Sequence, residues 1–209
     1  AHATFAPGWK WEKLTARLAI PIINAYHVPI SDGRTVLELT PTRWCAPEAG
    51  GRIGENYARG SYEHDPATHR YRFLLAGQLR PIDISGWFGD WWPDFFKTFQ
   101  FPSAPPPASV EVAGRWGRNT AGESRVIVAA QANGAEFRGA HFAYARARLF
   151  LRPFFLDALE LYGTEGPGWL RGTFTRVLEP QTYEWHRFDF AINTNAIDLT
   201  LSEKIFGAA

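Results

Sequence analysis

Alternation of apolar and polar side chains runs through most of this chain and constrains its fold more than any other feature. The pattern is clearest in five segments, residues 71–79, 109–117, 141–151, 169–178 and 185–193. It places Phe73 and Leu75 on one face of the first segment, Val110 and Val112 on one face of the second, and Leu149 on one face of the third. Because side chains repeat with a period of two only in a β-strand, these segments are predicted strands with one apolar face.

Short turn signals separate the alternating segments. They are Ser31-Asp32-Gly33, Ala49-Gly50-Gly51, His64-Asp65-Pro66, Ala132-Asn133-Gly134, residues 163–168 and Glu179-Pro180. Asn133-Gly134 suits a type I′ turn and is the best candidate for a hairpin. Residues 10–19 fit a short helix or a strand, and we favour a strand from Thr15 onward. The sequence therefore predicts an all-β, mainly antiparallel fold, in which a long meander forms a curved sheet or half-pipe.

One aromatic stretch interrupts the strands. In "ISGWFGDWWPDFFKTFQF", residues 84–101, eight of the eighteen residues are aromatic. Asp90 can cap a helix whose first turn tolerates Pro93, and a shorter turn is expected over residues 83–89. The Pro-rich residues 101–109 then favour an extended connection. We therefore expect a short aromatic helical insert at about 83–100.

Helical spacing divides the side chains of this insert into two faces. Trp91, Phe95 and Phe99 form one stripe with Trp92 and Phe96 beside it, and Asp94, Lys97 and Thr98 form the polar face. The stripe could plug the core against the sheet, lie as a lid over a lipid groove, or contact a membrane. The core plug is favoured, and membrane contact is least favoured because the polar face lacks a row of Lys and Arg.

Four short sequence pairs recur in the same order and indicate an internal repeat. They are "ARLAI" with "ARLFL", "LEL" with "LEL", "GRIGENY" with "GWLRGTF", and "HRYRF" with "EWHRF". The predicted organisation is a single β-rich domain over 1–209, with repeat units at 15–80 and 108–200 around a helical and Pro-rich insert at 81–108.

Composition narrows the function classes. The net charge of +1 gives no global field to attract nucleic acid, and the single Cys45 excludes an internal disulfide framework and any multi-Cys metal site. The chain contains no Met, not even at position 1, which indicates a processed form or a fragment of a longer protein. We favour the fragment.

No catalytic motif stands out. The G-x-S-x-G, H-E-x-x-H and Walker A patterns are absent from the sequence. Asp83, Asp90 and Asp94 flank the aromatic stretch and could act as paired carboxylates, but helix capping and a solvated face explain them more simply. We expect a non-catalytic protein without cofactor or metal.

Two polar clusters in the sequence are candidate binding sites. His64, Asp65 and His69 could form a metal loop, although ordinary hairpin histidines are the simpler interpretation. Arg146, Arg148 and Arg152 alternate along one predicted strand and could meet a phosphate headgroup. A solvated outer face is their usual explanation.

Two long segments resemble a known family. "LAGQLRPIDISGWFGDWWPDFFKTFQFPSAPPPASVEVAGRWG" and "RGAHFAYARARLFLRPFFLDALELYGTEGPGWLRGTF" are similar to AsmA-like proteins of the Gram-negative envelope, relatives of TamB and of chorein-type lipid-transfer proteins. The shared pattern is a glycine before a short apolar strand, a helical excursion, and strands ending in "L.L....G...G.F". Gly114, residues 145–149, Leu159, Leu161, Gly168 and Gly172 lie where this repeat would place them. The resemblance covers residues 70–205.

This resemblance implies a half-pipe that is apolar inside, in a periplasmic chain whose parent protein is anchored in the inner membrane. It implies a lipid, such as a phospholipid, as the partner, bound or guided along the groove during envelope biogenesis, and no nucleic acid. The candidate groove residues are Phe73, Leu75, Trp87, Trp91, Trp92, Phe95, Phe96, Val110, Val112 and Leu149.

Two other functions stay open at this point. The first is a lipocalin-like closed barrel that binds or acts on a small hydrophobic molecule. The second is a structural module whose sheet edges dock neighbouring repeats. A barrel pairs its first and last strands, whereas a half-pipe leaves both edges open.

Overall fold

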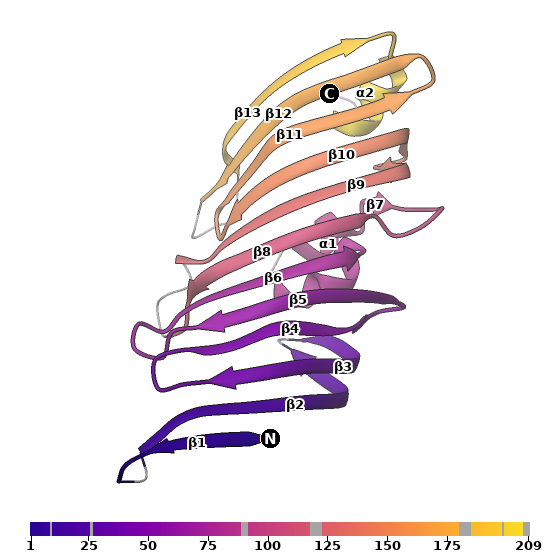
Figure 1. Cartoon of the computed structure of the whole chain (residues 1–209). Helices are drawn as coiled ribbons and strands as arrows, with labels where there is room; N and C mark the ends of the chain where they lie inside the picture. The colour runs from indigo at the N-terminus through magenta and orange to yellow at the C-terminus, as the bar shows by residue number, and fades with distance from the viewer. Residues whose placement is uncertain are drawn as a thin grey trace.

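A single curved antiparallel sheet makes up most of the molecule (Figure 1). The computed structural model describes residues 1–8, 10–25, 27–88, 92–117, 123–179, 185–197 and 199–206. Within them the sheet has 13 strands, and its first and last strands, β1 and β13, lie at opposite ends of it. The predicted all-β, antiparallel meander is thus confirmed.

The strands follow one another along the chain. They are β1 (His2–Ala6), β2 (Lys10–Ala25), β3 (Val28–Leu39), β4 (Trp44–Ile53), β5 (Asn56–His64), β6 (Arg70–Gln78), β7 (Phe99–Gln100), β8 (Pro107–Arg115), β9 (Arg125–Phe137), β10 (Ala140–Arg152), β11 (Phe155–Glu165), β12 (Gly168–Leu178) and β13 (Trp185–Asn195). The helical elements are the 3₁₀-helix η1 (Pro81–Trp87) and the α-helices α1 (Trp92–Phe96) and α2 (Leu199–Phe206).

The sheet is open. Each strand pairs with its neighbours in chain order, except the two-residue β7, which lies beside β9. Among the described residues no pairing joins β1 to β13, so the sheet ends in two edges. The closed lipocalin-like barrel is therefore wrong as a description of this fold.

The two faces of the sheet differ in what covers them. In β6, Phe73 and Leu75 are half-buried while Arg72 and Leu74 are exposed, as the alternation predicted. The helical insert packs against the first pair, and we call that side the inner face and the opposite side the outer face. Residues paired across neighbouring strands share a face. The strand register therefore shows which face the remaining residues of the sheet occupy.

The predicted hairpin at Asn133-Gly134 is wrong. Both residues lie inside β9, where Gly134 has a φ of +68°, and the chain reverses at Arg138-Gly139, where φ is +51° and +75°. Two consecutive positive φ values are those of a type I′ turn. Gly134 supplies a kink within the strand instead.

The kink coincides with a change of face in the neighbouring strand β10. Ala140 and Phe142 are buried at its start, whereas Leu149 and Leu151 point inward at its end. The alternation predicted His141 on the same face as Leu149, but His141 is exposed. The alternation of side chains in the sequence cannot reveal such a kink, because a prediction from a period of two assumes an unbroken pleat.

Two further predicted turns also lie within strands. Ser31-Asp32-Gly33 belongs to β3, where Asp32 has a φ of +52° and the register with β4 shifts. Ala49-Gly50-Gly51 belongs to β4. A Cβ on Gly51 would lie 2.6 Å from the Ile30 side chain, so this glycine allows close packing between strands and does not turn the chain. By contrast, the turns at His64-Asp65-Pro66 and residues 163–168 are confirmed.

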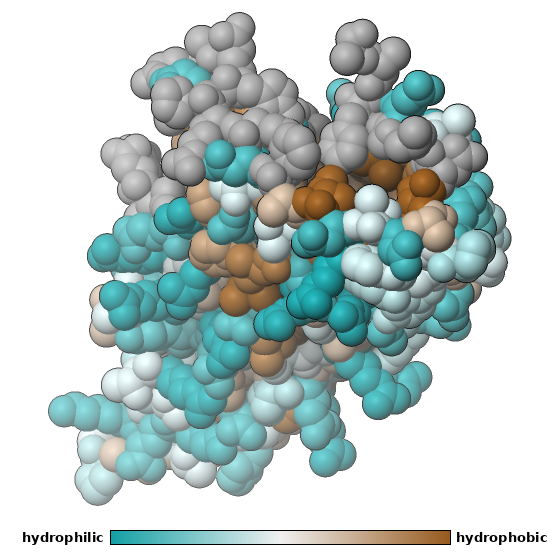
Figure 2. All heavy atoms as spheres, turned by 90° about the horizontal axis from the view of Figure 1, so that it is seen from above, coloured by the Kyte–Doolittle hydropathy of each residue, from teal (hydrophilic) through white to brown (hydrophobic). Residues whose placement is uncertain are grey.

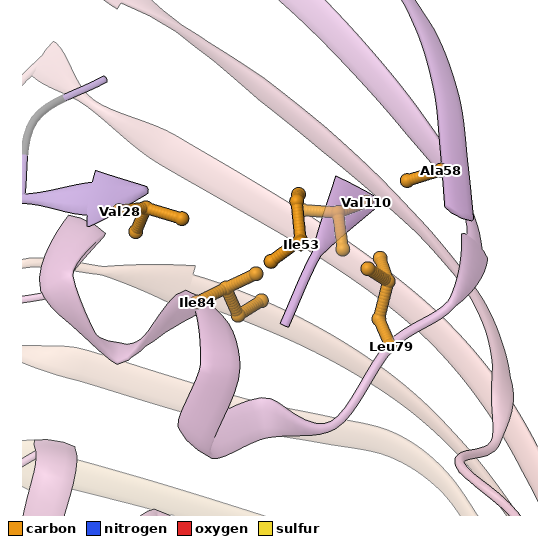
Figure 3. Packing of buried hydrophobic residues seen from close by; sticks show 6 residues of the cluster. All are labelled: Val28, Ile53, Ala58, Leu79, Ile84 and Val110. Carbon is orange, nitrogen blue, oxygen red and sulfur yellow. The ribbon is translucent and has the colours of Figure 1, made fainter. Parts of the chain in front are cut away.

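The insert covers the middle of the inner face in two contacts. In the first, Ile84 of η1 and the adjoining Leu79 pack with Val28, Ile53, Ala58 and Val110 from four strands (Figure 3). Trp87 adds a hydrogen bond from its Nε1 to the Ala25 carbonyl oxygen, 2.8 Å away. Gly86 permits this approach, since a Cβ there would lie 2.7 Å from the His27 carbonyl oxygen.

The second contact lies further along the sheet. Trp92 and Phe96 of α1 are 7% and 9% exposed and pack with Leu151 and Leu156 of β10 and β11. The insert therefore crosses the inner face obliquely, from β3 to β11. This is the core plug that the sequence favoured, and burial of each such side chain contributes about 1.5–3 kcal/mol.

The helix of the insert is shorter than predicted. α1 ends at Phe96, because the Thr98 backbone N–H and hydroxyl both donate to the Phe95 carbonyl oxygen. Phe99 consequently lies in β7 and not in the helix. Its ring is 4.8 Å from that of Phe137, although it still contacts the Phe95 ring, as predicted, with centroids 5.3 Å apart. Asp90 and Trp91 lie outside the described residues, so the predicted cap and the place of Trp91 stay predictions.

A second helix covers one end of the inner face. Leu201 of α2 is 5% exposed and packs with Ala140 and Phe142 of β10. Among the described helices none is both long enough and apolar enough to cross a membrane.

The edge at the N-terminal end is uneven. β1 pairs with residues 10–15 of the much longer β2, so residues 16–25 have no strand on that side among the described residues. This part of β2 contains Ile22 and Ile23, which are 74% and 42% exposed.

Phe96→Ala is expected to lower the free energy of unfolding by about 3–5 kcal/mol, because it opens a cavity between α1 and the sheet. Urea denaturation measures this change. Phe5→Ala is the matched control, since Phe5 is 52% exposed in β1 and should cost less than about 1 kcal/mol. Equal costs for both variants would show that the insert does not plug the core.

Asp83, in the insert, makes the stability of the fold depend on pH. Its carboxylate lies over the turn between β4 and β5, where a Cβ on Gly54 would be 3.1 Å from it. Burial raises the pKa of Asp83 above its ordinary 3.8, Arg80 opposes the rise, and Glu55 adds to it. The folded protein thus holds this proton more tightly than the unfolded chain does, so the carboxylate destabilises the fold increasingly as pH rises above 3.8.

Asp83→Asn is therefore expected to raise the Tm at pH 7, because the amide carries no charge to desolvate. The gain should disappear near pH 3, where Asp83 is protonated in both states. Thermal unfolding at the two pH values measures it, with the exposed Asp94→Asn as control. A gain that persists at pH 3 would contradict the assignment to titration.

Candidate functional site

The insert leaves one end of several strands uncovered on the inner face. A continuous row of inner-face residues lies at that end. Register joins Leu14 to Leu39, Leu39 to Trp44, Trp44 to His64, His64 to Tyr71, and Tyr71 to Gly114. We call these six residues the rim row. They cross β2, β3, β4, β5, β6 and β8, a span of roughly 24 Å, because neighbouring strands lie about 4.8 Å apart.

Aromatic rings fill the centre of the rim row. The Trp44 ring lies edge-on to His64 with centroids 5.2 Å apart, and Tyr71 stacks on Trp116 at 4.2 Å. Gly114 makes room for this stack, since a Cβ there would lie 2.7 Å from the Tyr71 hydroxyl. Trp44 is 43% exposed, so the rings form a surface that a ligand can reach.

Hydrogen bonds hold the polar tips of these rings. Trp116 Nε1 donates to the Tyr62 hydroxyl over 3.1 Å, and the Tyr71 hydroxyl lies 3.4 Å from Ser124 Oγ. The Trp116 backbone N–H donates to the His69 carbonyl oxygen at 2.9 Å, which fixes the segment that follows β8. The platform is thus rigid before any ligand binds.

His64 introduces an unsatisfied polar atom into this platform. Its Nε2 is buried and has no hydrogen-bond partner among the described residues. An unpaired buried polar atom costs about 1–3 kcal/mol, so such atoms are rare and mark positions to explain. Here it lies among the rings of Trp44, Tyr62 and His69.

An apolar area adjoins the rim row on the same face. Register places Leu18 opposite Thr35, Thr35 opposite Ala49, Ala49 opposite Gly60, and Gly60 opposite Leu75 of the inner face. Leu18 is 37% exposed, and Leu37 is half-buried on the same face. We call the rim row with Leu18 and Leu37 the open quarter, because neither cluster of the insert includes these residues.

Apolar surface also reaches solvent elsewhere. Seen from the C-terminal end of the sheet, apolar side chains form a broken band between polar flanks (Figure 2).

The structure brings the predicted groove residues together, but in the core. Trp92, Phe96 and Val110 are buried, and the half-buried set is Phe73, Leu75, Trp87, Phe95, Val112 and Leu149. All lie between the sheet and the insert, in contact with one another. Their side chains therefore cover each other, and the uncovered surface for a ligand lies in the open quarter.

Sequence reasoning missed the residues of the open quarter. The alternation in residues 71–79 and 109–117 puts Tyr71 on the face of Phe73, and Trp116 on the face of Val110 and Val112. The signal that could have found them is a second set of aromatic residues two or four positions from the core residues in the same strands.

Arg176 is a further inner-face residue that was not predicted. It pairs with Leu156 in register, beside the second contact of the insert. Burial and, to a smaller extent, the positive charge of Arg138 together lower the pKa of Arg176 to about 10. This residue places a positive charge beside the apolar side chains of the second contact.

The histidine loop forms a turn. Asp65 accepts hydrogen bonds from the Thr68 hydroxyl at 2.7 Å and from the Ala67 backbone N–H at 2.9 Å, and these bonds lower the pKa of Asp65. In the described part of the chain no group of three or more His, Cys, Asp or Glu side chains could hold a metal ion.

Comparison with known proteins found no counterpart. No family model, no curated protein and no solved structure matches the chain. The function must therefore be argued from the open quarter and its surroundings.

His64→Phe is expected to stabilise the protein by about 1 kcal/mol, because it replaces an unsatisfied buried nitrogen with an apolar ring of similar shape. Urea denaturation measures the effect. The same change at the exposed His141 is the control and should stay within about 0.5 kcal/mol of zero. Destabilisation at His64 would mean that its Nε2 has a partner in solution.

Proposed function

We propose that the chain is a non-catalytic lipid-binding segment whose open quarter takes an acyl chain. The main support for this proposal is that the helical elements cover only part of the inner face. An apolar sheet face has to be covered by another sheet, a helix or a ligand. The insert and α2 cover the middle and one end, and Leu18 and Trp44 stay exposed beyond them.

The size of the open quarter supports an acyl chain. The rim row spans roughly 24 Å. The hydrocarbon core of a bilayer is about 30 Å thick, so one leaflet needs about 15 Å of chain. Each buried methylene contributes about 0.8 kcal/mol, and a single chain along the row would bind appreciably.

The polar groups of the site support a lipid with a headgroup. The Tyr62 hydroxyl and the Trp116 indole N–H, which are hydrogen-bonded to each other, give the apolar surface a polar edge, which is where a glycerol or ester group would lie. The rings also bind without reorganisation, because they are already stacked and hydrogen-bonded.

The biological setting that we propose follows the resemblance. An AsmA-like chain of this kind would belong to a periplasmic, membrane-anchored parent protein that guides phospholipid during envelope biogenesis. The open, curved meander with its helical excursion after β6 agrees with that architecture.

The edge of β2 favours a second candidate function, a structural module. Residues 16–25 of β2 present an unpaired strand edge among the described residues, and such an edge can add a strand from a neighbouring repeat. This function does not exclude lipid binding, since it uses the edge and leaves the inner face free.

Leu18→Glu tests the lipid site. Native mass spectrometry of protein purified from cells, followed by lipid extraction, should find bound phospholipid in the native protein and at least about tenfold less in Leu18→Glu, because a charge on the groove opposes an acyl chain. Leu74→Glu is the matched control, since Leu74 is 38% exposed on the outer face while Leu18 is 37% exposed on the inner face.

The control should retain the full lipid content. Native protein that carries no lipid, and takes up none from phosphatidylcholine vesicles, would overturn the proposal. Equal losses in both variants would also contradict it, since they would show a dependence on charge and not on the face.

A further inference from the structure

A hollow opens on the outer face, away from the open quarter. Its volume is about 550 Å³, and it lies over β10, β11, β12 and β13. Its lining includes Arg148, Glu160, Arg171, Thr173 and Asn193. Register pairs Arg148 with Glu160 and Arg171 with Asn193, so these side chains share one face.

A bulge in β11 creates the hollow. The register of β11 shifts against both neighbours between Ala158 and Leu161, which leaves Leu159 as an additional residue. Leu159 is 53% exposed and borders the hollow on this side. A bulge bends its strand and redirects its side chains, and small residues such as Ala191 leave the floor open.

The structure separates the three arginines of β10. Arg146 forms an ion pair with Glu160 and lies over the Tyr162 ring. Arg152 lies over the Phe155 ring, with its Cζ 4.4 Å from the ring centroid. Arg148 has neither kind of contact among the described residues, and the same is true of Arg171 on β12.

The charges around the hollow are unbalanced. Arg148 and Arg171 line it directly, and Arg146 adjoins it. Glu160 is the carboxylate in the lining, and it is already engaged by Arg146. In the lining itself, two guanidinium groups face one carboxylate, and Arg146 already pairs with that carboxylate, so Arg148 and Arg171 are left to attract an anion.

The donors suit a phosphate group in particular. β10 and β12 are two strands apart, about 10 Å, a distance that two arginine side chains can close from opposite sides. Guanidinium groups bind phosphate oxygens in pairs of parallel hydrogen bonds, and the Thr173 hydroxyl and Asn193 amide can supply further donors.

We propose that this hollow is a phosphate-binding site, with Arg148 and Arg171 as its ligands. The phosphate can belong to a free phosphate compound or to an anionic lipid headgroup. The site is independent of the lipid proposal above, because it lies on the opposite face of the sheet.

Isothermal titration with inorganic phosphate at low salt tests the site. The native protein should bind, and Arg148→Gln and Arg171→Gln should each weaken binding about tenfold or more, because each removes a charge-assisted contact. Glu160→Gln should tighten binding. Arg59→Gln, which removes the same charge from the outer face of β5, is the control and should bind like the native protein.

Vesicles separate the two sources of phosphate. If Arg148 and Arg171 hold a headgroup, the native protein should bind phosphatidylcholine vesicles more tightly when they contain phosphatidic acid, and the double variant should lose this gain. Phosphate binding without vesicle binding assigns a free phosphate compound. Equal binding by the native protein and the double variant, or an equal loss in Arg59→Gln, would overturn the site. Leu18→Glu should leave phosphate binding unchanged, so the two proposals can fail separately.

Discussion

The packing of one short aromatic insert against one face of a very wide sheet is the contact on which the rest of this structure depends. An antiparallel sheet of this width has a large apolar surface on one side, and exposure of all of this surface to water would be unfavourable. Ile84 covers it at β3 to β8, and Trp92 and Phe96 cover it at β10 and β11. The oblique path of the insert leaves the open quarter uncovered, so the core and the candidate site are two results of the same contact.

Much of the fold could be predicted from the sequence, because a period of two reports directly on which face a side chain occupies. Phe73, Leu75 and Val110 lie where alternation placed them. The wrongly predicted turns were assigned from glycines and from Asp32. A glycine, or a residue with a positive φ, can form a turn, but it can also kink a strand or allow two strands to pack closely. Gly134 kinks a strand and Gly51 allows close packing, yet in the sequence both look like turns. Only the pairing of distant strands distinguishes these uses.

The candidate site was less accessible to sequence reasoning. Apolar residues that face inward can line a groove or fill a core, and the difference depends on how far the insert reaches along the sheet. Phe96 is buried beneath the insert and the half-buried Leu149 packs against it, whereas Trp44 and Trp116 lie at the rim. Likewise, the sequence does not distinguish the three arginines of β10. In the structure, Arg146 and Arg152 contact residues of the neighbouring strand, whereas Arg148 lines the hollow with Arg171.

The proline at position 21 has a consequence for how this protein behaves at high concentration. It lies in the middle of the bare edge of β2, between Ile20 and the exposed Ile22. An apolar, weakly charged edge is the kind of segment that recruits identical strands into fibrils, and such segments usually lack proline. Because Pro21 has no N–H to donate, any strand that adds there misses a hydrogen bond at its centre. We therefore expect Pro21 to oppose the addition of identical strands along this edge.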